Sequence, residues 1–303
     1  MKNINILLVL LSLFLFSCPM QKYTTIKTVV EIQTDKPLSD KGLSALSTKI
    51  QQRLVDFNFP IKDLNLDKGK KQLTIIADVK EEDMDTYNSI FDSHQLDFWD
   101  TFRTDDFQIK QIDSTLLQVE GFITDPPSGF SLLPEELGRC QAADKLSDIA
   151  LQLQENLKSV KHLKLIWSVE QKMFDQKEYR LYMIDTQGKT ESPLTEQAIK
   201  DTQVEKGSYG DYSISFKFDE AGTKTWTNMT QNAAFNGNRS IAIVLDGQIV
   251  MCPKVMEPIY GGSCMISGSY TKEVAVDLMK KLQMGRLPYP LKILEQTVIS
   301  KVE

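Results

Sequence analysis

The segment from residue 240 to residue 293 constrains the fold of this chain most strongly, because nearly every residue in it has a local structural role. Two β-rich runs, residues 240–245 and 248–251, flank the dipeptide Asp246-Gly247. This dipeptide tolerates the positive φ angles that a tight hairpin turn requires. The pattern therefore predicts a β-hairpin.

The second half of the same segment predicts a turn, a strand and a helix. Gly261 and Gly262 permit another chain reversal before a strand at residues 264–267. Thr271 is a good N-cap for the helix that follows, and Gly285 ends that helix. The apolar positions expected on one face of this helix are Val274, Ala275, Leu278, Met279 and Leu282.

These residues resemble the periplasmic head subdomain of SecD, an auxiliary subunit of the bacterial Sec protein-export system. The matching positions are 242–247, Pro253, Gly261, Gly262, 266–268, Thr271, Gly285 and 287–291. The resemblance extends back through residues 179–230, which look like the earlier strands and helix of that head. It implies a surface that contacts translocating polypeptide, and Sec translocon subunits as partners.

The N-terminal part of the mature chain predicts a ferredoxin-like base. Its apolar periodicity alternates between strand and helix in the order βαββαβ. The six expected elements span residues 26–33, 39–57, 61–66, 72–79, 82–92 and 96–102. Residues 44–79 and 95–102 also resemble the SecD base, and Arg53 matches a helix arginine of that family, although Ala77-Asp78-Val79 replaces its Pro-Gly.

The chain is thus expected to be an α+β protein with several parts. The predicted parts are a lipoprotein signal peptide at 1–17, a lipid-anchored tether at 18–25, the ferredoxin-like base at 26–102, a connecting segment at 103–169 and a SecD P1-head-like subdomain at 170–298. Within the connecting segment we expect strands at 107–112, 115–122 and 162–168 and a helix at 142–157.

The N-terminus reads as a targeting segment. Lys2 precedes an apolar run at residues 4–16, which is too short to cross a bilayer permanently. Residues 15–18 resemble a bacterial lipobox, in which Cys18 would be acylated; an ordinary secreted protein with a free Cys18 is the alternative. No later run reaches about 18 apolar residues, so we expect a periplasm-facing lipoprotein whose only membrane contact is its lipid anchor.

The composition and motifs argue against most catalytic and nucleic-acid functions. The formal net charge is -6, and no basic stripe is present to replace phosphate counterions. The only two histidines, His94 and His162, are not spaced as metal ligands, and no nucleophile elbow or phosphate loop occurs. We therefore predict no enzyme activity, no metal, no cofactor and no nucleic-acid partner.

Two cysteines and a set of apolar side chains near the hairpin are the remaining candidates. Cys252 and Cys264 stand where the SecD-like pattern has small residues, so they form either a disulfide or two separate buried thiols. The side chains predicted to bind polypeptide are Met251, Met256, Tyr260 and Met265, because flexible thioethers suit varied apolar partners. They could equally belong to the core.

The function predicted from these features is that of a non-catalytic accessory in protein export, which binds translocated polypeptide or the translocon. An envelope interaction protein that reuses the same fold for an unrelated partner is the alternative, because a fold alone does not determine function.

Overall fold

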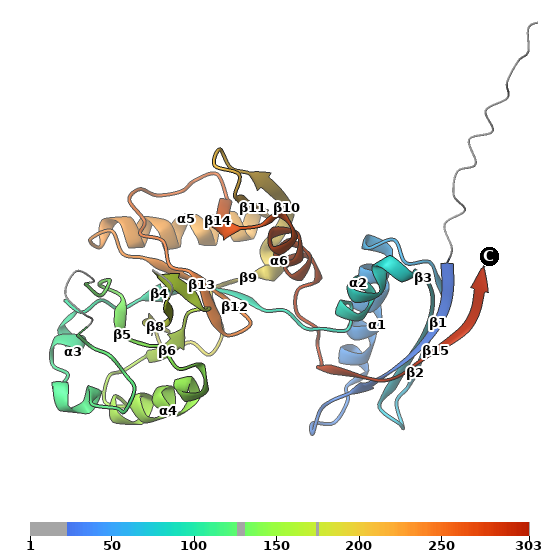
Figure 1. The fold of residues 1–303 in the computed structure, drawn as a ribbon, viewed down its shortest axis with the longest axis horizontal. Helices are drawn as coiled ribbons and strands as arrows, with labels where there is room; N and C mark the ends of the chain where they lie inside the picture. The colour runs from blue at the N-terminus through green and yellow to red at the C-terminus, as the bar shows by residue number, and fades with distance from the viewer. Residues whose placement is uncertain (1–22, 126–130, 174–175, 303) are drawn as a thin grey trace, which may run out of the picture. The chain divides into compact units, whose positions relative to one another are not determined.

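The computed structural model describes residues 23–125, 131–173 and 176–302, and the chain divides into two compact units (Figure 1). The base unit runs up to Asp92 and resumes at Pro288, and the inserted unit spans Ser93–Leu287. The predicted signal peptide, Cys18 and residues 18–22 of the predicted tether lie outside the described residues, whereas residues 23–25, also assigned to the tether, belong to the first strand of the base. In the part of the chain that is described, no helix has the length and hydropathy needed to span a membrane.

The base unit is a four-stranded antiparallel sheet in the order β15-β1-β3-β2. Its elements are β1 (Tyr23–Ile32), α1 (Asp40–Asp56), β2 (Ile61–Asp67), β3 (Gln72–Lys80), α2 (Met84–Ser89) and β15 (Leu291–Val302). This is the strand order of a ferredoxin-like fold, with β15 as the fourth strand. Both helices cover one face of the sheet, which agrees with the strict alternation of buried residues along β3 (Figure 1).

The structure corrects the predicted closure of the base. The strand expected to close it, at residues 96–102, forms β4 (Leu96–Thr101) and pairs with strands of the inserted unit instead. Five of the six β4 residues are buried, so this strand needs cover on both faces, and a sheet with helices on one side cannot provide it. The amphipathic and largely exposed β15 closes the base, so the base also includes residues that the sequence assigned to the head.

A buried arginine connects α1 to the end of α2 in the base. The Arg53 side chain is 1% exposed and donates hydrogen bonds to the backbone carbonyls of Ile90 and Asp92, the latter at 2.7 Å. Burial lowers the pKa of Arg53 to about 10, and the charge of Asp92 opposes this shift. The side chain therefore satisfies carbonyls beyond α2 that no further helical turn reaches.

The inserted unit contains two sheets. The eight-stranded sheet has the order β13-β12-β4-β8-β5, with β6, β7 and β9 paired alongside, and the three-stranded sheet has the order β10-β11-β14. The strands of the larger sheet, besides β4, are β5 (Glu136–Cys140), β6 (Leu163–Trp167), β7 (Gln171–Met173), β8 (Gln176–Asp185), β9 (Leu194–Thr195), β12 (Ile241–Leu245) and β13 (Gln248–Met251). The smaller sheet consists of β10 (Ile199–Lys206), β11 (Tyr212–Phe218) and β14 (Ser263–Tyr270).

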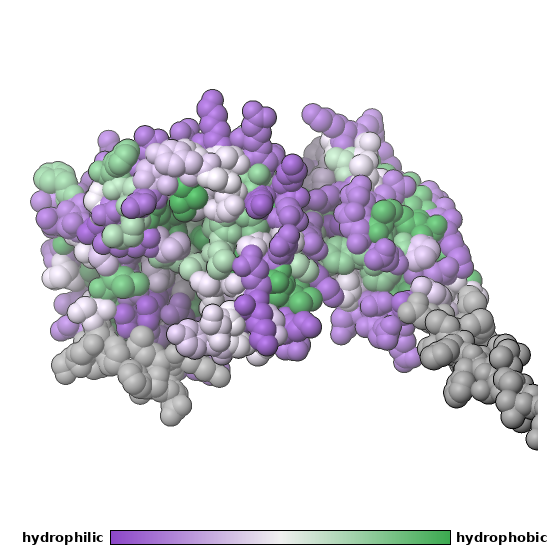
Figure 2. All heavy atoms as spheres, turned by 90° about the horizontal axis from the view of Figure 1, so that it is seen from above, coloured by the Kyte–Doolittle hydropathy of each residue, from purple (hydrophilic) through white to green (hydrophobic). Residues whose placement is uncertain are grey.

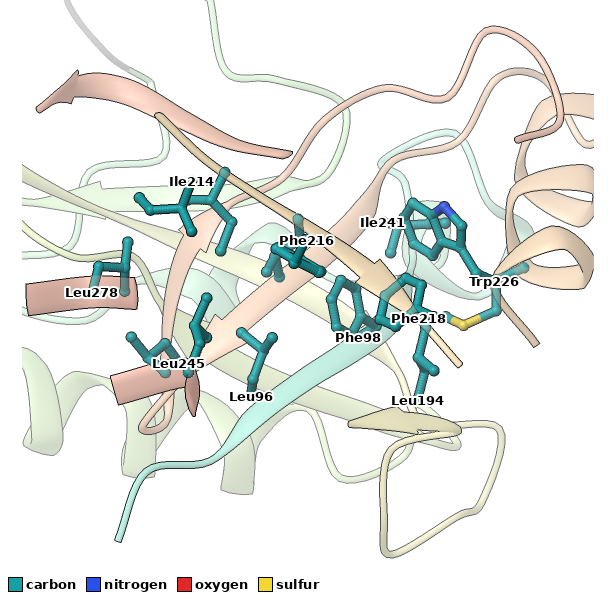
Figure 3. Close-up of a cluster of buried hydrophobic side chains, with 14 of the residues drawn as sticks. Leu96, Phe98, Leu194, Ile214, Phe216, Phe218, Trp226, Ile241, Leu245 and Leu278 are labelled. Atoms are coloured by element: carbon teal, nitrogen blue, oxygen red, sulfur yellow. The ribbon is translucent and has the colours of Figure 1, made fainter. Parts of the chain in front are cut away.

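The helices of the inserted unit are α3 (Phe107–Lys110), α4 (Leu146–Asn156), α5 (Glu220–Phe235) and α6 (Lys272–Met284), with short 3-10 turns at Ser114–Leu117, Ala143–Lys145 and Glu196–Ala198. The largest core of this unit joins its two sheets to α5 and α6 (Figure 3). Phe98 of β4 lies at its centre, with ring centroids 5.5 Å from both Phe218 and Trp226. Such edge-to-face contacts add to the stability that burial of the rings provides.

The predictions for the 240–293 segment agree with the structure in its backbone. Asp246 and Gly247 have φ angles of 50° and 82°, and Gly262 has a φ of 63°. The Thr271 hydroxyl caps α6 by accepting from the Val274 amide, and Gly285 follows the helix with a φ of 62°. On the helix face, Ala275, Leu278 and Leu282 are buried and Met279 is partly buried, but Val274 is 48% exposed and was wrongly placed there.

Two strands predicted in the connecting segment are wrong. Residues 107–112 begin with the single-turn helix α3, and residues 115–122 overlap a 3-10 turn and a loop. The Asp113 carboxylate accepts from the Thr115 amide, a local bond that favours the 3-10 turn over a strand. Asp106 makes no such cap to α3, because its carboxylate accepts from the preceding Arg103 amide. The helix and strand predicted at 142–157 and 162–168 are present as α4 and β6.

Candidate functional site

A cavity of about 640 Å³ in the inserted unit is the strongest candidate for a functional site. It lies where the three-stranded sheet meets the connection between β13 and β14. The lining residues are Asp201, Gln203 and Glu205 of β10, Ser215, Phe216 and Lys217 of β11, Trp226 of α5, Met251, Pro253, Lys254, Val255, Met256, Glu257 and Ile259 around the connection, and Ser263, Cys264 and Met265 of β14. Its size is that of an ordinary small-ligand or side-chain pocket.

Hydrogen bonds to α5 and to the turn after it hold one wall of the cavity in place. The Asn238 side-chain amide donates to the carbonyls of Val255 and Met256, both at 3.1 Å. Further along, the Ile259 amide donates to the Thr230 hydroxyl at 3.0 Å. Because these contacts fix the backbone of the connection, its apolar side chains line the cavity although they belong to no regular element.

The three-stranded sheet provides the opposite wall in regular rows. Across the strands, Ser215 lies opposite both Gln203 and Met265, and Lys217 lies opposite both Asp201 and Ser263. These residues lie on the face of the sheet away from the core, because the alternate residues Ile214 and Phe216 are buried on the other face. The wall is therefore polar apart from Met265.

The structure brings three of the four predicted polypeptide-binding residues together. Met251, Met256 and Met265 all line the cavity, whereas Tyr260 does not. The Met256 and Met265 side chains are 65% and 45% exposed, so neither is fully absorbed into the core, while Met251 partly packs against it. Tyr260 is 69% exposed outside the cavity.

Sequence reasoning missed the apolar floor and the connecting wall of the cavity. Trp226 and Phe216 form the floor, and Val255 and Ile259 belong to the wall. The Trp226 indole N–H donates to the Ser263 carbonyl at 3.2 Å, which holds the ring beside β14. In the sequence, Trp226 shows only the helical periodicity of a core residue, and no pattern marks it as cavity lining.

The two cysteines of this region are separate thiols in the structure, so the disulfide alternative does not hold there. Cys264 packs against the core that joins the two sheets, whereas Cys252 packs against a different cluster around Trp99 and Tyr182. Burial raises the pKa of the Cys264 thiol to about 12 and also raises the pKa of Cys252. Both thiols are therefore protonated at neutral pH and are poor nucleophiles.

A second cavity of the inserted unit, of about 810 Å³, is polar. Its lining includes Asp100, Asp106, Asp185 and Arg239. Arg239 forms a bidentate ion pair with Asp106, in which one guanidinium nitrogen lies 2.8 Å from a carboxylate oxygen. Despite partial burial, this pairing lowers the pKa of Asp106, so the lining holds a compensated charge pair as well as the carboxylates of Asp100 and Asp185.

The histidines are not part of either cavity. The Nδ1 atom of His94 lies 2.9 Å from one carboxylate oxygen of Asp246, and the other oxygen accepts from the Gln95 amide. Burial opposes the shift, but these hydrogen bonds lower the pKa of Asp246 overall. Across the described ranges, no group of three or more histidine, cysteine or acidic side chains is arranged to hold a metal ion.

The fold and the cavity together define an α+β module in which a ferredoxin-like base carries an inserted unit with a methionine-lined pocket. Residues 172–289, which contain every residue that lines this pocket, match the model of the SecDF P1 head subdomain. This part of the chain is therefore similar to a P1 head of the SecDF type, and the recognition of a SecD periplasmic domain and of its α+β class is confirmed.

Curated SecD subunits also match part of this chain. The SecD subunit of Calditerrivibrio nitroreducens is 40% identical over 112 residues, which are 37% of this chain and 21% of that protein. The SecD subunit of Rickettsia bellii is 42% identical over 86 residues, or 28% of this chain and 16% of that protein. The chain thus matches about a fifth of the length of these relatives.

The likeness of fold reaches beyond the head. A structure described as a membrane component SecDF that enhances protein export covers 90% of this chain and 100% of its own, with a TM-score of 0.54 and 19% identity. SecDF in a super-membrane-facing form covers 90% of this chain and 30% of its own, with the same TM-score and 17% identity. At these identities the likeness establishes the fold alone.

Proposed function

We propose that this chain is a non-catalytic, periplasm-facing accessory in protein export, which binds translocating polypeptide in the methionine-lined cavity of its head. The observation that carries the proposal is the position of Met251, Met256 and Met265 around one pocket within the region that matches the SecDF head. Thioether side chains adapt to varied apolar partners, as a protein that contacts many client sequences requires.

The exposure of the pocket supports a binding role over a packing role. Met256 and Ile259 leave 65% and 38% of their surface exposed, so neither side chain is taken up by the adjoining core. The chemistry of the pocket gives no support for catalysis, because its thiol, Cys264, is held protonated by burial. We further propose that the chain is held at the membrane by a lipid on Cys18.

Site-specific photocrosslinking in cells tests this role. A photoreactive amino acid at Met256 should give adducts with nascent exported chains or with Sec subunits. The same amino acid at Tyr209 serves as the control, because Tyr209 is 99% exposed in the turn after β10 and does not line the cavity. Adducts at Met256 with one unrelated envelope protein, and with no exported chain or Sec subunit, would favour the alternative of an interaction protein that reuses the fold.

Mass analysis of the mature protein tests the anchor separately. We expect the N-terminus at Cys18 with attached acyl chains, and loss of membrane association in Cys18→Ser. A mature protein whose N-terminus carries no fatty acid would remove the lipoprotein part of the proposal and leave the binding role standing.

A further inference from the structure

We propose that the head binds its polypeptide as an added β-strand, along the open edge of β14, with the client's apolar side chains entering the methionine-lined cavity. This inference rests on the proposed function and specifies how the same site works. It begins from the position of β14, which is the last strand of the three-stranded sheet and pairs with β11 on one side.

The register of β14 shows which of its backbone groups face outward. The Phe218 amide donates to the Gly262 carbonyl at 2.8 Å, so these opposite residues form a hydrogen-bonded pair. Because bonded and non-bonded pairs alternate in an antiparallel ladder, Cys264 and Ile266 also bond to β11. The amides and carbonyls of Ser263, Met265 and Ser267 must therefore point away from β11.

Independent contacts agree with this assignment. The outward carbonyl of Ser263 accepts the Trp226 indole N–H, so the first position of the edge is already used. The Met265 amide has the Cys264 sulfur beside it, which is a weak acceptor. The next two outward positions, Met265 and Ser267, consequently present a row of donors and acceptors that an extended backbone can complement.

The cavity lies along this edge. Ser263, Cys264 and Met265 all belong to its lining, and Met251 and Met256 face the same space from the other side (Figure 2 shows apolar areas interrupting the polar surface). A strand added beside β14 would place every second side chain toward the core side of the sheet, where Phe216 and Trp226 form an apolar floor. The intervening side chains would lie on the opposite face, which carries Ser215 and Met265.

The charges of the lining indicate which sequences fit best. The carboxylates of Asp201, Glu205 and Glu257 outnumber the ammonium groups of Lys217 and Lys254. Asp201 and Lys217 lie directly opposite each other and compensate locally. The remaining excess of negative charge favours an extended segment with alternating apolar residues and a neighbouring lysine or arginine.

Proline at Ser267 gives a sharp test in the full chain. Proline is tolerated on an edge strand where its missing N–H would face outward, and the preceding Ile266 is already extended, so Ser267→Pro should fold. The matched control is Ser267→Ala, which changes the same side chain but keeps the amide. The probe is a synthetic peptide of alternating valine and threonine with lysine at both ends, and the readout is its affinity.

We expect Ser267→Pro to lower the affinity for the peptide by about tenfold, because the variant loses roughly one hydrogen bond and the proline ring keeps the added strand from approaching closely. Ser267→Ala should bind the peptide with the affinity of the wild type. Equal affinities for both variants would overturn strand addition; a simultaneous loss of binding in Met256→Ala would show that the cavity still binds peptide. No binding to the wild-type chain would overturn the peptide-binding role as well.

A second measurement does not depend on the variant. In the wild-type chain, hydrogen exchange at the Met265 and Ser267 amides should slow when the peptide is added, since an added strand would accept from them. Binding of the peptide with unchanged exchange at both amides would also overturn the inference.

Discussion

The four-stranded sheet of the base and the three-stranded sheet of the inserted unit are both antiparallel, but they differ in what lies beside their strands. In the base unit, β1 pairs along its whole length on both sides, with β3 and with β15, which comes from the far end of the chain. Among the described strands of the inserted unit, β14 pairs with β11 alone, and it borders a cavity. Both sheets keep edge strands, β15 and β2 in the base and β10 and β14 in the inserted unit, but the methionine-lined cavity borders the sheet of the inserted unit, where we propose that another chain adds to β14.

The side chains of the two regions differ in the same sense. The base core combines aliphatic residues from β1, β3 and α1, such as Val30, Leu73 and Ile50, each with no exposed surface, with the buried rings of Phe59, Tyr87 and Phe91. The head places methionines around its cavity, and two of them, Met256 and Met265, keep 65% and 45% of their surface exposed. Rigid branched side chains suit a core with one packing, while flexible thioethers suit contacts that change with the partner.

Removal of β15 should have the largest effect, and it should destabilise the base but not the inserted unit. A chain that ends at Pro290 loses the strand that pairs with all of β1, so we expect the base to lose its cooperative fold while the inserted unit keeps its own. Limited proteolysis read by mass spectrometry should then cut within residues 23–92 and spare 93–287. The control is Val298→Ala, whose side chain is 53% exposed; protection of the base in the shortened chain would show that β15 is dispensable.

Truncation of the cavity floor should weaken the head strongly. Trp226 is 2% exposed and contacts the rings of Phe98 and Phe218, so Trp226→Ala should lower the free energy of unfolding by about 3–5 kcal/mol. Trp226→Phe keeps most of the ring but loses the hydrogen bond to Ser263, and should cost less. Denaturant unfolding monitored in the inserted unit measures both, and equal losses for the two variants would contradict a packing role for the ring.

Replacement of the buried arginine should affect the base to a smaller degree. Arg53→Met keeps the length of the side chain but leaves the carbonyls of Ile90 and Asp92 without this donor, so we expect a loss of about 1–3 kcal/mol. Arg53→Lys retains a charged donor and should recover part of that stability. Thermal unfolding of the base measures the difference, and a methionine variant as stable as the wild type would contradict the capping role.

The ion pair of the polar cavity should give the head a pH dependence in the acid range. Pairing with Arg239 holds the pKa of Asp106 below its ordinary value of 3.8, so its stabilisation is present above that value and disappears as the pH falls through the folded-state pKa. Asp106→Asn should lose about 1 kcal/mol at neutral pH and lose less than the wild type on acidification. Parallel stability curves for the two proteins between neutral and acid pH would contradict this assignment.

Truncation of Met256 should have the smallest effect on stability and should separate binding from packing. Met256→Ala removes a side chain that is 65% exposed, so the free energy of unfolding should change by about 0.5 kcal/mol or less. Its affinity for the valine-threonine peptide should nevertheless fall, and Met256→Leu should restore part of it. A variant that loses stability but binds peptide normally would place Met256 in the core and not in a binding site.

From the sequence alone, the local elements of the 240–293 segment and the SecD-like character of the head could be predicted. Asp246-Gly247, Thr271 and Gly285 act on their immediate neighbours through positive φ angles and a side-chain cap, so their effects could be predicted without a partner strand. The same ordered residues carry the resemblance to SecD that the comparisons confirm. The three methionines predicted near the hairpin also lie around the cavity, whereas Tyr260 does not.

The strand that closes the base, and the place of the proposed binding edge, could be found only from contacts between distant segments. Residues 96–102 and 291–302 both read as strands, and their assignment depends on whether both faces of a strand can be covered, which is a property of distant segments. The cavity likewise joins β10, α5 and the β13–β14 connection, which are far apart in sequence. Local propensity acts over a few residues, whereas sheet pairing and burial act between segments that meet only after folding.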